Sequence, residues 1–463
     1  MSIIYKKVEQ IIGPLLFLKN EHDVQYGEVV KIQTDNEIIR TGQVVDLSED
    51  IIVIEAYEDT KGLSSENSEI LFTEDSFKIK ISKDMFGKNF NALGKPFDIN
   101  TKKILDSDIL PDIELDINGA PINPFAREYP SDVIQTGISV IDGLFTLIRG
   151  QKLPIFSSQG LPHNKLAAQI ASQSKVLTKE PFLIIFCGIG IIQDEALFFL
   201  NKFQKSGNIQ NIISFMNLAD DPIMERLLIP RVALTTAEYF AFEKDMHVLV
   251  ILIDITNYAE ALRELSSAKE EIPSRKGYPG YLYSDFASLY ERTGKIKGKK
   301  GTITQIPILT MPNDDISHPI PDTTGYITEG QLVLNRNIHK QAIYPPFEVL
   351  ASISRLMKDA IGKDNTREDH ADISSQLLAS YSKSLEVRDL ISIVGEEGLN
   401  SDQKELLEFG NLFENRFINQ ETDENREFSQ TFEIAWNVLS ILNKNQLLRI
   451  HQQYIDKYYL EKM

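Results

Sequence analysis

The fold of this chain is decided by the stretch Lys152-Leu153-Pro154-Ile155-Phe156-Ser157-Ser158-Gln159-Gly160-Leu161-Pro162-His163-Asn164. Its first five residues are mostly apolar and predict a buried strand, and a helix is predicted from Asn164 to Lys175. The segment between them contains Gly160. A strand, a glycine-containing loop and a helix in this order form the framework on which phosphate-binding loops are built. The stretch therefore has the location of such a loop within an α/β fold.

The residues of this loop differ from those that phosphate binding requires. In a working loop, a lysine reaches the terminal phosphates and the hydroxyl of the next residue holds magnesium. Here His163 stands in the position of the lysine and Asn164 in that of the hydroxyl, while Pro162 lacks a backbone N–H. Histidine is largely neutral near pH 7, so it is a poor permanent counter-charge for phosphate. Taken alone, these residues indicate a plain strand–loop–helix connection, and the motifs around them are needed to favour a degenerate phosphate loop.

A second element of a phosphate site is a buried strand that ends in an aspartate. The run His-Val-Leu-Val-Ile-Leu-Ile-Asp at 247–254 supplies it, and Asp254 comes at the carboxyl end, where parallel sheets bind ligands. We expect Asp254 to orient magnesium through water. The alternative interpretation is that it caps the helix predicted from Thr256 to Lys269.

A third element, the carboxylate that positions the attacking water, is absent from its expected place. We expect such a carboxylate just past the neighbouring strand, which is predicted from Leu183 to Cys187. That strand is followed by Gly-Ile-Gly-Ile-Ile at 188–192, and the first acids come later, at Asp194 and Glu195. Because both the lysine and the acid are missing, the sequence predicts no independent catalysis.

The hydrophobic pattern divides the chain into three predicted domains. Residues 1–72 contain short β-branched runs separated by turn residues, which predict a small antiparallel β-barrel. Residues 73–346 alternate apolar runs with helical stretches, which is typical of an α/β domain with a mainly parallel sheet. Residues 347–463 carry apolar residues at helical spacing and predict a C-terminal helical bundle. One such stripe consists of Phe432, Ala435, Trp436 and Leu439.

The composition limits the function classes. The chain has 463 residues, with 48 basic and 67 acidic side chains and a formal net charge of −19, so we expect no nucleic-acid binding. Its single cysteine, Cys187, excludes an internal disulfide framework and suits the cytosol. No apolar run is long enough to cross a bilayer, and no secretory signal is visible at the N-terminus. Membrane association would therefore come through partners.

Several long motifs resemble the B subunits of vacuolar-type and archaeal-type rotary ATPases over essentially the whole chain. These motifs occupy residues 134–139, 160–165, 257–264, 277–283, 305–315 and 325–330. The sequence Gly-Leu-Pro-His at 160–163 is typical of B subunits, whereas catalytic A subunits keep Gly-Lys-Thr. The chain is identified on these motifs as a member of the non-catalytic B-subunit family.

The resemblance implies a set of partners and ligands. It implies an alternating ring of three A and three B subunits, contacts with a central rotor stalk and a peripheral stalk, and an indirect connection to a membrane ion-translocating sector. ATP or ADP with magnesium would lie at the A–B interface, held mainly by the A subunit, with none bound tightly by this chain alone. Vestigial nucleotide-binding positions would be Gly160, His163, Asn164 and Asp254.

The resemblance also implies that the B subunit supplies an arginine finger across one interface. The matching residue is Arg355, within the segment Val349 to Met357. An arginine supplied in trans stabilises the charge on the transferring phosphoryl group. Without the resemblance, Arg355 would be interpreted as a solvated helix charge. The preceding segment 345–348, Pro-Pro-Phe-Glu, and Ala351 depart from the usual family pattern.

Three further features have two interpretations each. The basic, glycine-containing segment 274–280 contacts either a nucleotide or the rotor. Arg263 either lines the vestigial pocket or forms a salt bridge with Glu260 on the same helix. His318 has no companion His or Cys at metal-ligand spacing, so we expect a packed or surface histidine and no metal site in this chain.

The leading hypothesis is a regulatory subunit of the peripheral ATP-hydrolysing sector of a V-type proton-transporting ATPase. The motifs at 343–346, 355–362 and 394–397 favour a compact vacuolar pump on the cytosolic face of an endomembrane. The alternative is the B subunit of a bacterial or archaeal A/V-type ATP synthase or sodium pump, on the plasma membrane. A self-sufficient RecA-like NTPase is disfavoured by the missing lysine and acid. An actin contact is not expected, because the chain begins almost at the predicted barrel.

Overall fold

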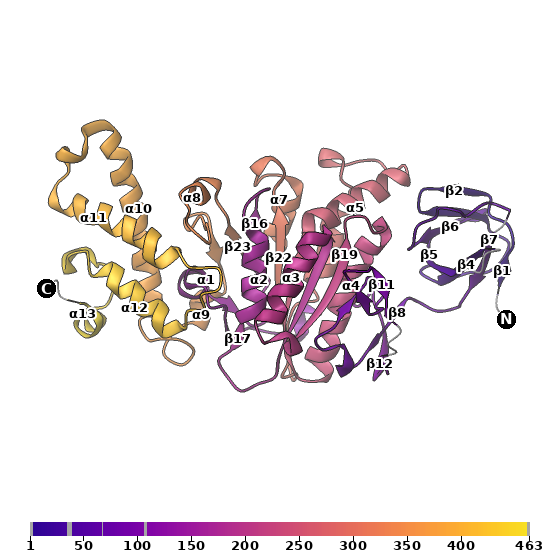
Figure 1. Cartoon of the computed structure of the whole chain (residues 1–463), viewed down its shortest axis with the longest axis horizontal. Coiled ribbons are helices and arrows are strands. Elements are labelled where there is room, and N and C mark those ends of the chain that lie inside the picture. Colours follow the sequence, from indigo (N-terminus) through magenta and orange to yellow (C-terminus); the bar gives the residue numbers. More distant parts are fainter. Residues whose placement is uncertain (1–2, 35–38, 67, 106–108, 461–463) are drawn as a thin grey trace.

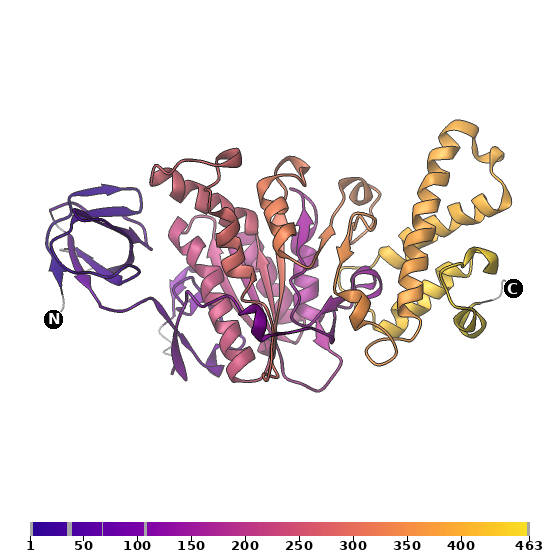
Figure 2. The same cartoon turned by 180° about the vertical axis from the view of Figure 1, so that it is seen from behind.

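The computed structural model describes residues 3–34, 39–66, 68–105 and 109–460 and shows three parts in a row (Figures 1 and 2). A β-barrel lies at the N-terminal end, an α/β domain in the middle and a helical domain at the C-terminal end. The two termini lie at opposite ends of the elongated molecule. The predicted multidomain architecture is confirmed.

The N-terminal barrel is an antiparallel sheet with strand order β1-β7-β4-β5-β6-β3-β2. The inward residues of its strands alternate with outward ones, so that Ile52 and Ile54 of β6 are both fully buried. These and other apolar residues form a core that belongs to the barrel alone. Its strands are β1 (Ile4–Tyr5), β2 (Gln10–Ile12), β3 (Leu15–Lys19), β4 (Val29–Thr34), β5 (Ile39–Leu47), β6 (Ile51–Ala56) and β7 (Ser68–Phe72).

Short strands connect the barrel to the central sheet. Two antiparallel pairs are formed by β8 (Lys78–Ile81) with β12 (Ile113–Asp116) and by β10 (Phe97–Asp98) with β11 (Lys103–Ile104). β9 (Asn89–Phe90) pairs in parallel with the outer strand β19 of the central sheet. A small separate sheet has the order β15-β14-β17, formed by β14 (Val133–Gln135), β15 (Leu147–Ile148) and β17 (Lys175–Val176).

The central sheet has the order β24-β23-β16-β22-β20-β18-β19-β9 and is parallel from β23 to β9. The apolar runs predicted as buried strands lie at its centre, and every residue of β20 is buried. The parallel sheet of a RecA-like domain is thus present. Its strands are β16 (Ile155–Ser157), β18 (Phe182–Ile191), β19 (Ile212–Leu218), β20 (His247–Ile253), β22 (Thr302–Thr310), β23 (Gly330–Val333) and β24 (Ile353–Ser354), and a side pair is formed by β13 (Arg127–Glu128) and β21 (Gly294–Ile296).

Helices cover both faces of this sheet. α2 (His163–Gln173) and α3 (Gln193–Lys205) bury their apolar sides in one cluster, and α4 (Ile223–Glu238) and α5 (Ile255–Ala268) bury theirs in a second cluster on the opposite face. The helix predicted from Asn164 to Lys175 ends two residues early, because Lys175 already belongs to β17. The remaining helices of this domain are α1 (Ser139–Leu144), α6 (Leu282–Tyr290), α7 (Pro319–Ile327), α8 (Arg336–Lys340) and α9 (Met357–Ala360).

The C-terminal domain is helical, as predicted. The stripe formed by Phe432, Ala435, Trp436 and Leu439 is buried on α12. Its apolar residues join the same cluster as α2 and α3, so this domain shares a core with the sheet domain. Its helices are α10 (His370–Val394), α11 (Ser401–Leu412), a π-helical segment (Phe413–Ile418), α12 (Phe428–Leu439) and α13 (Gln452–Tyr458). Within the described residues, no helix combines the length and the hydropathy needed to span a membrane.

The central sheet extends past residue 346, where the sequence placed the start of the C-terminal domain. β24 pairs antiparallel with β23, with Gly330 opposite Ser354 and Gln331 opposite Ile353. A two-residue edge strand is too short to show periodicity in the sequence, so the hydrophobic pattern did not reveal it.

Candidate functional site

The predicted nucleotide site lies at the carboxyl edge of three adjacent strands. β16 and β22 pair so that Ser157 lies opposite Thr310, and β20 lies on the other side of β22. The loop 158–162 follows β16, and Asp254 follows β20. The structure therefore brings Gly160, His163 and Asn164 to the same sheet edge as Asp254, where the topology of a parallel sheet places ligand sites.

The loop is closed by its own hydrogen bonds. The Nδ1 atom of His163 lies 3.0 Å from the hydroxyl of Ser157. The N–H of Leu161 donates to the carbonyl of Ser158 at 3.0 Å, and the N–H of His163 donates to the carbonyl of Leu161 at 2.9 Å. Gly160 adopts a φ of +82°, as the turn requires. Because these N–H groups point to carbonyls of the loop, they do not form the cradle that holds phosphate in a working loop.

Asn164 is hydrogen-bonded to Glu195, one of the acids that follow the segment 188–192 and lie too far along the chain for the predicted position of the catalytic carboxylate. Its amide donates to Oε1 of Glu195 at 2.7 Å, and Oε2 of Glu195 accepts the N–H of Ile192 at 3.4 Å at the start of α3. The two carboxylate oxygens of Glu195 therefore bind the Asn164 amide and cap the start of α3. As predicted, β18 is the neighbour of β20, the strand that ends just before Asp254, and it pairs with β20 in parallel.

Asp254 caps α5, which was the alternative interpretation of this residue. Its Oδ1 accepts the N–H of Thr256 at 2.8 Å and the N–H of Thr310 at 3.2 Å, and its Oδ2 accepts the hydroxyl of Thr310. The carboxylate thus joins the ends of β20 and β22. That Asp254 also orients magnesium through water stays a prediction from the sequence.

Arg336 on α8 is a loop contact that sequence reasoning missed. Its Nη2 donates to the carbonyl of Gln159 at 2.9 Å, and its guanidinium binds both carboxylate oxygens of Asp314, at 2.9 and 3.0 Å. The guanidinium lowers the pKa of the Asp314 carboxyl, with help from the Ser158 hydroxyl. No local motif signals this contact, because it joins positions far apart in the chain.

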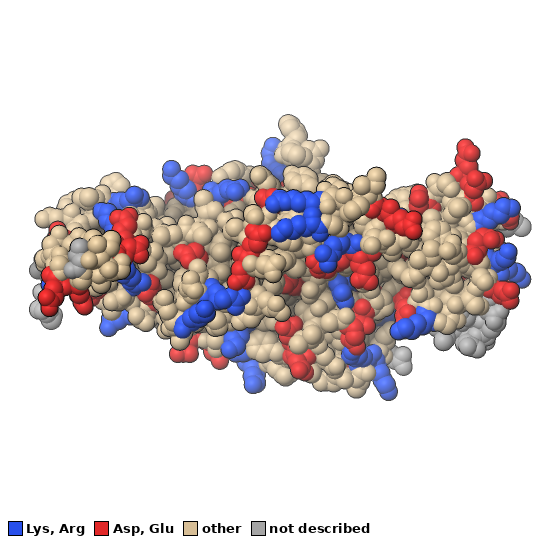
Figure 3. Space-filling view, turned by 90° about the horizontal axis from the view of Figure 1, so that it is seen from above, with Lys and Arg blue, Asp and Glu red and all other residues tan. Residues whose placement is uncertain are grey.

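Other cations of this face are also paired with carboxylates. Basic and acidic side chains lie side by side on the surface seen from above (Figure 3). In the segment 274–280, Arg275 pairs with Asp322 at 2.9 Å and Lys276 with Asp315 at 3.0 Å. These lysine and arginine side chains are held within the chain.

Two further predicted residues follow the simpler of their interpretations. Arg263 forms an ion pair with Glu260 on α5 and lies over the ring of Tyr278, 5.4 Å from its centroid. His318 is 6% exposed and contacts the same tyrosine ring edge-on, so it is packed, and burial lowers its pKa.

Arg355 lies away from the loop, on the edge strand side of the sheet. It follows β24 directly rather than lying on a helix, so its interpretation as a helix charge is wrong. Its N–H donates to the carbonyl of Glu329 at 2.9 Å, and its Nη1 donates to the carbonyl of Thr328 at 3.2 Å. The side chain is exposed, and within the described residues no carboxylate lies in salt-bridge range of it.

Arg355 and the loop lie at opposite ends of the strands. Glu329 and Lys152 mark the amino end of β23 and β16, where the Glu329 N–H donates to the Lys152 carbonyl. The loop begins after Ser157, at the carboxyl end. The six residues from Lys152 to Ser157 run beside β22 in continuous register, and the five steps between them span about 16 Å of extended chain.

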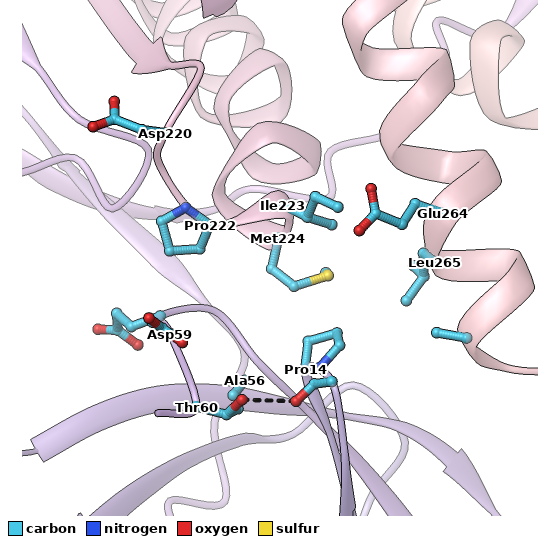
Figure 4. Close-up of a pocket in the computed structure, with 13 residues that line it drawn as sticks. Pro14, Ala56, Asp59, Thr60, Asp220, Pro222, Ile223, Met224, Glu264 and Leu265 are labelled. Atoms are coloured by element: carbon cyan, nitrogen blue, oxygen red, sulfur yellow. Dashed lines mark hydrogen bonds between the residues drawn. The ribbon is translucent and has the colours of Figure 1, made fainter. Parts of the chain in front are cut away.

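A cavity between the barrel and the central domain is separate from both places. It has a volume of about 410 Å³ and contains none of the predicted site residues. Pro14 of the barrel lies across it from Met224 and Leu265 of the central domain, and the acidic residues Asp59, Asp220 and Glu264 also line it (Figure 4). It forms a domain junction rather than a phosphate site, since none of the described residues that line it is basic.

The loop residues do not fit a magnesium nucleotide. The position of the magnesium-binding hydroxyl holds an amide that is already bonded to Glu195. The position of the lysine holds His163, which is bonded to Ser157. Among the described residues, no three His, Cys, Asp or Glu side chains gather as a metal site.

Comparison with known proteins shows the same division into three parts. Residues 8–74 match the beta-barrel domain of the ATP synthase alpha/beta family, residues 137–354 match its nucleotide-binding domain, and residues 359–459 match the C-terminal domain of V and A type ATP synthase. A V-type ATP synthase beta chain from Halothermothrix orenii is 52% identical over 456 residues, which are 98% of this chain and 97% of the relative.

A solved structure has the same fold. It is that of the ATP synthase subunit NeqB from Nanoarcheaum equitans, which aligns with a TM-score of 0.73 and 41% identity over 92% of this chain and 98% of that chain. The barrel, the nucleotide-binding domain with a phosphate loop that lacks its lysine, and the V- and A-type C-terminal domain occur together in this chain. It therefore belongs to the ATP synthase alpha/beta family, as a B subunit of the V and A type.

Proposed function

We propose that this chain is a non-catalytic, regulatory subunit of an ion-translocating rotary complex, and that Arg355 completes the ATP site of the neighbouring catalytic subunit. The observation that carries the proposal is the state of Arg355, which is exposed and, among the residues that the structure describes, hydrogen-bonds only to backbone carbonyls. Arg336, Arg275 and Lys276 on the loop face are instead paired with carboxylates. An unpaired guanidinium on the surface is available to an anionic group on a partner.

The chemistry of such a contact follows from the guanidinium. It is planar, always charged and carries five N–H donors, so it can bind phosphate oxygens of a nucleotide held by another subunit. An arginine supplied in trans stabilises the charge of the transferring phosphoryl group and accelerates the reaction by about 10³- to 10⁵-fold. A shift of about 1 Å is enough to lose about 10²-fold. Movement between subunits would then switch hydrolysis on and off and couple it to rotation.

ATP or ADP with magnesium is, in this proposal, a substrate held mainly by the catalytic A subunit. This chain's own loop lacks the lysine and the hydroxyl, and the N–H groups of Leu161 and His163 are bonded within the loop, so we expect no tight nucleotide binding by the chain alone. Three copies would alternate with three A subunits around a rotor stalk. Peripheral stalk subunits would connect the ring to a membrane sector, with the ring on the cytosolic face.

Two versions of the complex were distinguished from the sequence, a vacuolar proton pump and a prokaryotic A/V-type ATP synthase or sodium pump. The relatives in Halothermothrix orenii and Nanoarcheaum equitans support the prokaryotic version. We therefore propose a V/A-type complex on the plasma membrane that transports protons.

Reconstitution with the A subunit tests the proposal. We expect the assembled ring to hydrolyse ATP and this chain alone to be inactive. An Arg355→Ala ring should assemble normally and lose at least about 10³-fold in kcat, because the finger acts on the transition state. A matched control is Lys358→Ala, which removes an exposed cation three residues away. Normal turnover by the Arg355→Ala ring would exclude the finger.

A further inference from the structure

We infer that the ion pair between the buried Lys152 and the partly buried Glu329 positions Arg355, and that it acts on turnover only through that arginine. This inference rests on the proposed function of Arg355. Neither residue touches the reacting atoms, so both are positioning residues rather than catalytic ones.

Lys152 is a nearly buried cation at the start of the loop strand. Its side chain is 2% exposed, and its Nζ lies 2.7 Å from Oε1 of Glu329 and 3.2 Å from Oε1 of Glu291. A buried ammonium is stable only when it is paired, and removal of one partner of such a pair is strongly destabilising to the local arrangement. The position of Glu329 is therefore coupled to that of Lys152.

Glu329 is held at both carboxylate oxygens by the same residue. Oε1 accepts from Nζ of Lys152, and Oε2 accepts the backbone N–H of Lys152 at 2.8 Å. The backbone N–H of Glu329 donates in turn to the carbonyl of Lys152 at 3.1 Å. These three contacts hold the turn 328–330 to Lys152, in the segment that leads into β16, with little freedom for Glu329 to rotate or slide.

Arg355 is hydrogen-bonded to the turn 328–330, which contains Glu329. Its backbone N–H donates to the Glu329 carbonyl, and its guanidinium donates to the Thr328 carbonyl. Both carbonyls belong to adjacent peptide groups of one turn. A displacement of Glu329 therefore moves the backbone and the side-chain tip of Arg355 together.

Gln151 forms a second connection to the turn 328–330 and also binds the end of β24. It is fully buried, and its Nε2 donates to the Glu329 carbonyl at 3.2 Å and to the hydroxyl of Ser354 at 2.9 Å. Ser354 directly precedes Arg355. Ser354 and the turn 328–330 are thus both held by Gln151 and Lys152, two adjacent residues just before β16.

The contacts of Lys152, Glu329 and Gln151 also predict which kinetic constant changes when they are lost. The loop strand β16 (Ile155–Ser157) follows Lys152 in the chain and leads into the vestigial loop. Loss of the anchor leaves the guanidinium charged and exposed but releases it from its set direction. Since phosphoryl transfer is sensitive to displacements of about 1 Å, kcat should fall while nucleotide binding by the partner stays intact.

The test uses the ring reconstituted with the catalytic partner. We expect Glu329→Ala to lower kcat about 10- to 100-fold with little change in KM for ATP. Glu329→Gln should retain more activity, because its amide oxygen still accepts from Lys152. Lys295→Met is the matched control, since it removes another lysine–glutamate pair, with Glu128 at 2.7 Å, that contains no residue of the turn 328–330.

A double-mutant cycle separates positioning from a general structural role. Glu329→Ala added to Arg355→Ala should cause no further loss of kcat, because Glu329 acts through a residue that is already absent. Independent losses that multiply, or a Glu329→Ala ring with normal kcat, would overturn the inference and leave the finger intact. Normal turnover by Arg355→Ala alone would instead overturn the proposed function. Ring assembly measured by size-exclusion chromatography shows that each variant has folded.

Discussion

At position 163, the exchange of lysine for histidine is one of several changes that close the loop. Pro162 removes an N–H, Asn164 replaces a hydroxyl, and the remaining N–H groups of Leu161 and His163 are bonded within the loop. Phosphate binding needs the cation and the cradle together. Restoring the cation alone should therefore achieve little.

We expect His163→Lys to leave the affinity of the isolated chain for magnesium ADP within about threefold of the wild type, or well under 1.4 kcal/mol. The triple change Pro162→Gly, His163→Lys and Asn164→Thr should tighten binding, because it restores the N–H, the cation and the hydroxyl. Isothermal titration calorimetry measures both. His451→Lys, at a side chain that is 74% exposed, controls for the added charge. A tenfold gain from the single change would show that the cradle is already present.

At the level of elements, the pairing of β23 with β24 depends on a glycine. Gly330 has a φ of +150°, and a Cβ at this position would lie 2.3 Å from the carbonyl oxygen of Ile353 and 3.1 Å from Cα of Ser354. Only a residue without a side chain lets the two strands approach so closely. The edge strand that carries Arg355 is therefore attached through Gly330.

Gly330→Ala should detach β24 and lower ring kcat in the same manner as Glu329→Ala. We also expect a loss of about 1–3 kcal/mol in the free energy of unfolding, as for other strained backbone positions. Urea denaturation of the isolated chain and ATPase assays of the ring measure the two effects. Gly207→Ala is the control, because Gly207 also has a positive φ, +71°, but no heavy atom within 4 Å of its Cβ position. Equal ATPase activity of the two variants would contradict this account.

At the level of the whole molecule, the junction of barrel and central domain contains a buried acid. Glu225, on α4, is 9% exposed, and burial together with Asp221 and Glu58 raises its pKa from the ordinary 4.5 to about 8. The folded chain therefore keeps this proton at pH values at which the unfolded chain has lost it. Its contribution to stability is complete below about pH 4.5 and is lost as the pH rises through 8.

Glu225→Gln should remove this pH dependence. The variant should match the wild type near pH 5 and exceed it at pH 9, by on the order of 3 kcal/mol in the free energy of unfolding. Urea unfolding at a series of pH values gives the difference. Glu264→Gln changes an exposed glutamate that lines the cavity between the barrel and the central domain (Figure 4), and it serves as the control. A difference that is constant across the pH range would rule out titration of Glu225.

The sequence by itself determined the three domains and the loss of the phosphate loop. Buried strands, helical stripes and turn residues are local patterns, so the barrel, the parallel sheet and the buried face of α12 were predictable. The identities of His163 and Asn164 likewise needed no coordinates. The role of Arg355 came from the resemblance alone.

Only the tertiary structure decided how these residues are held. Glu195 reaches Asn164, Arg336 reaches Gln159, and Glu329 meets both Lys152 and Arg355 across strands that are far apart in the sequence. Such contacts depend on strand order and register, which no local pattern specifies. The two-residue strand β24 was missed for the same reason, since pairing with β23, rather than periodicity, makes it a strand.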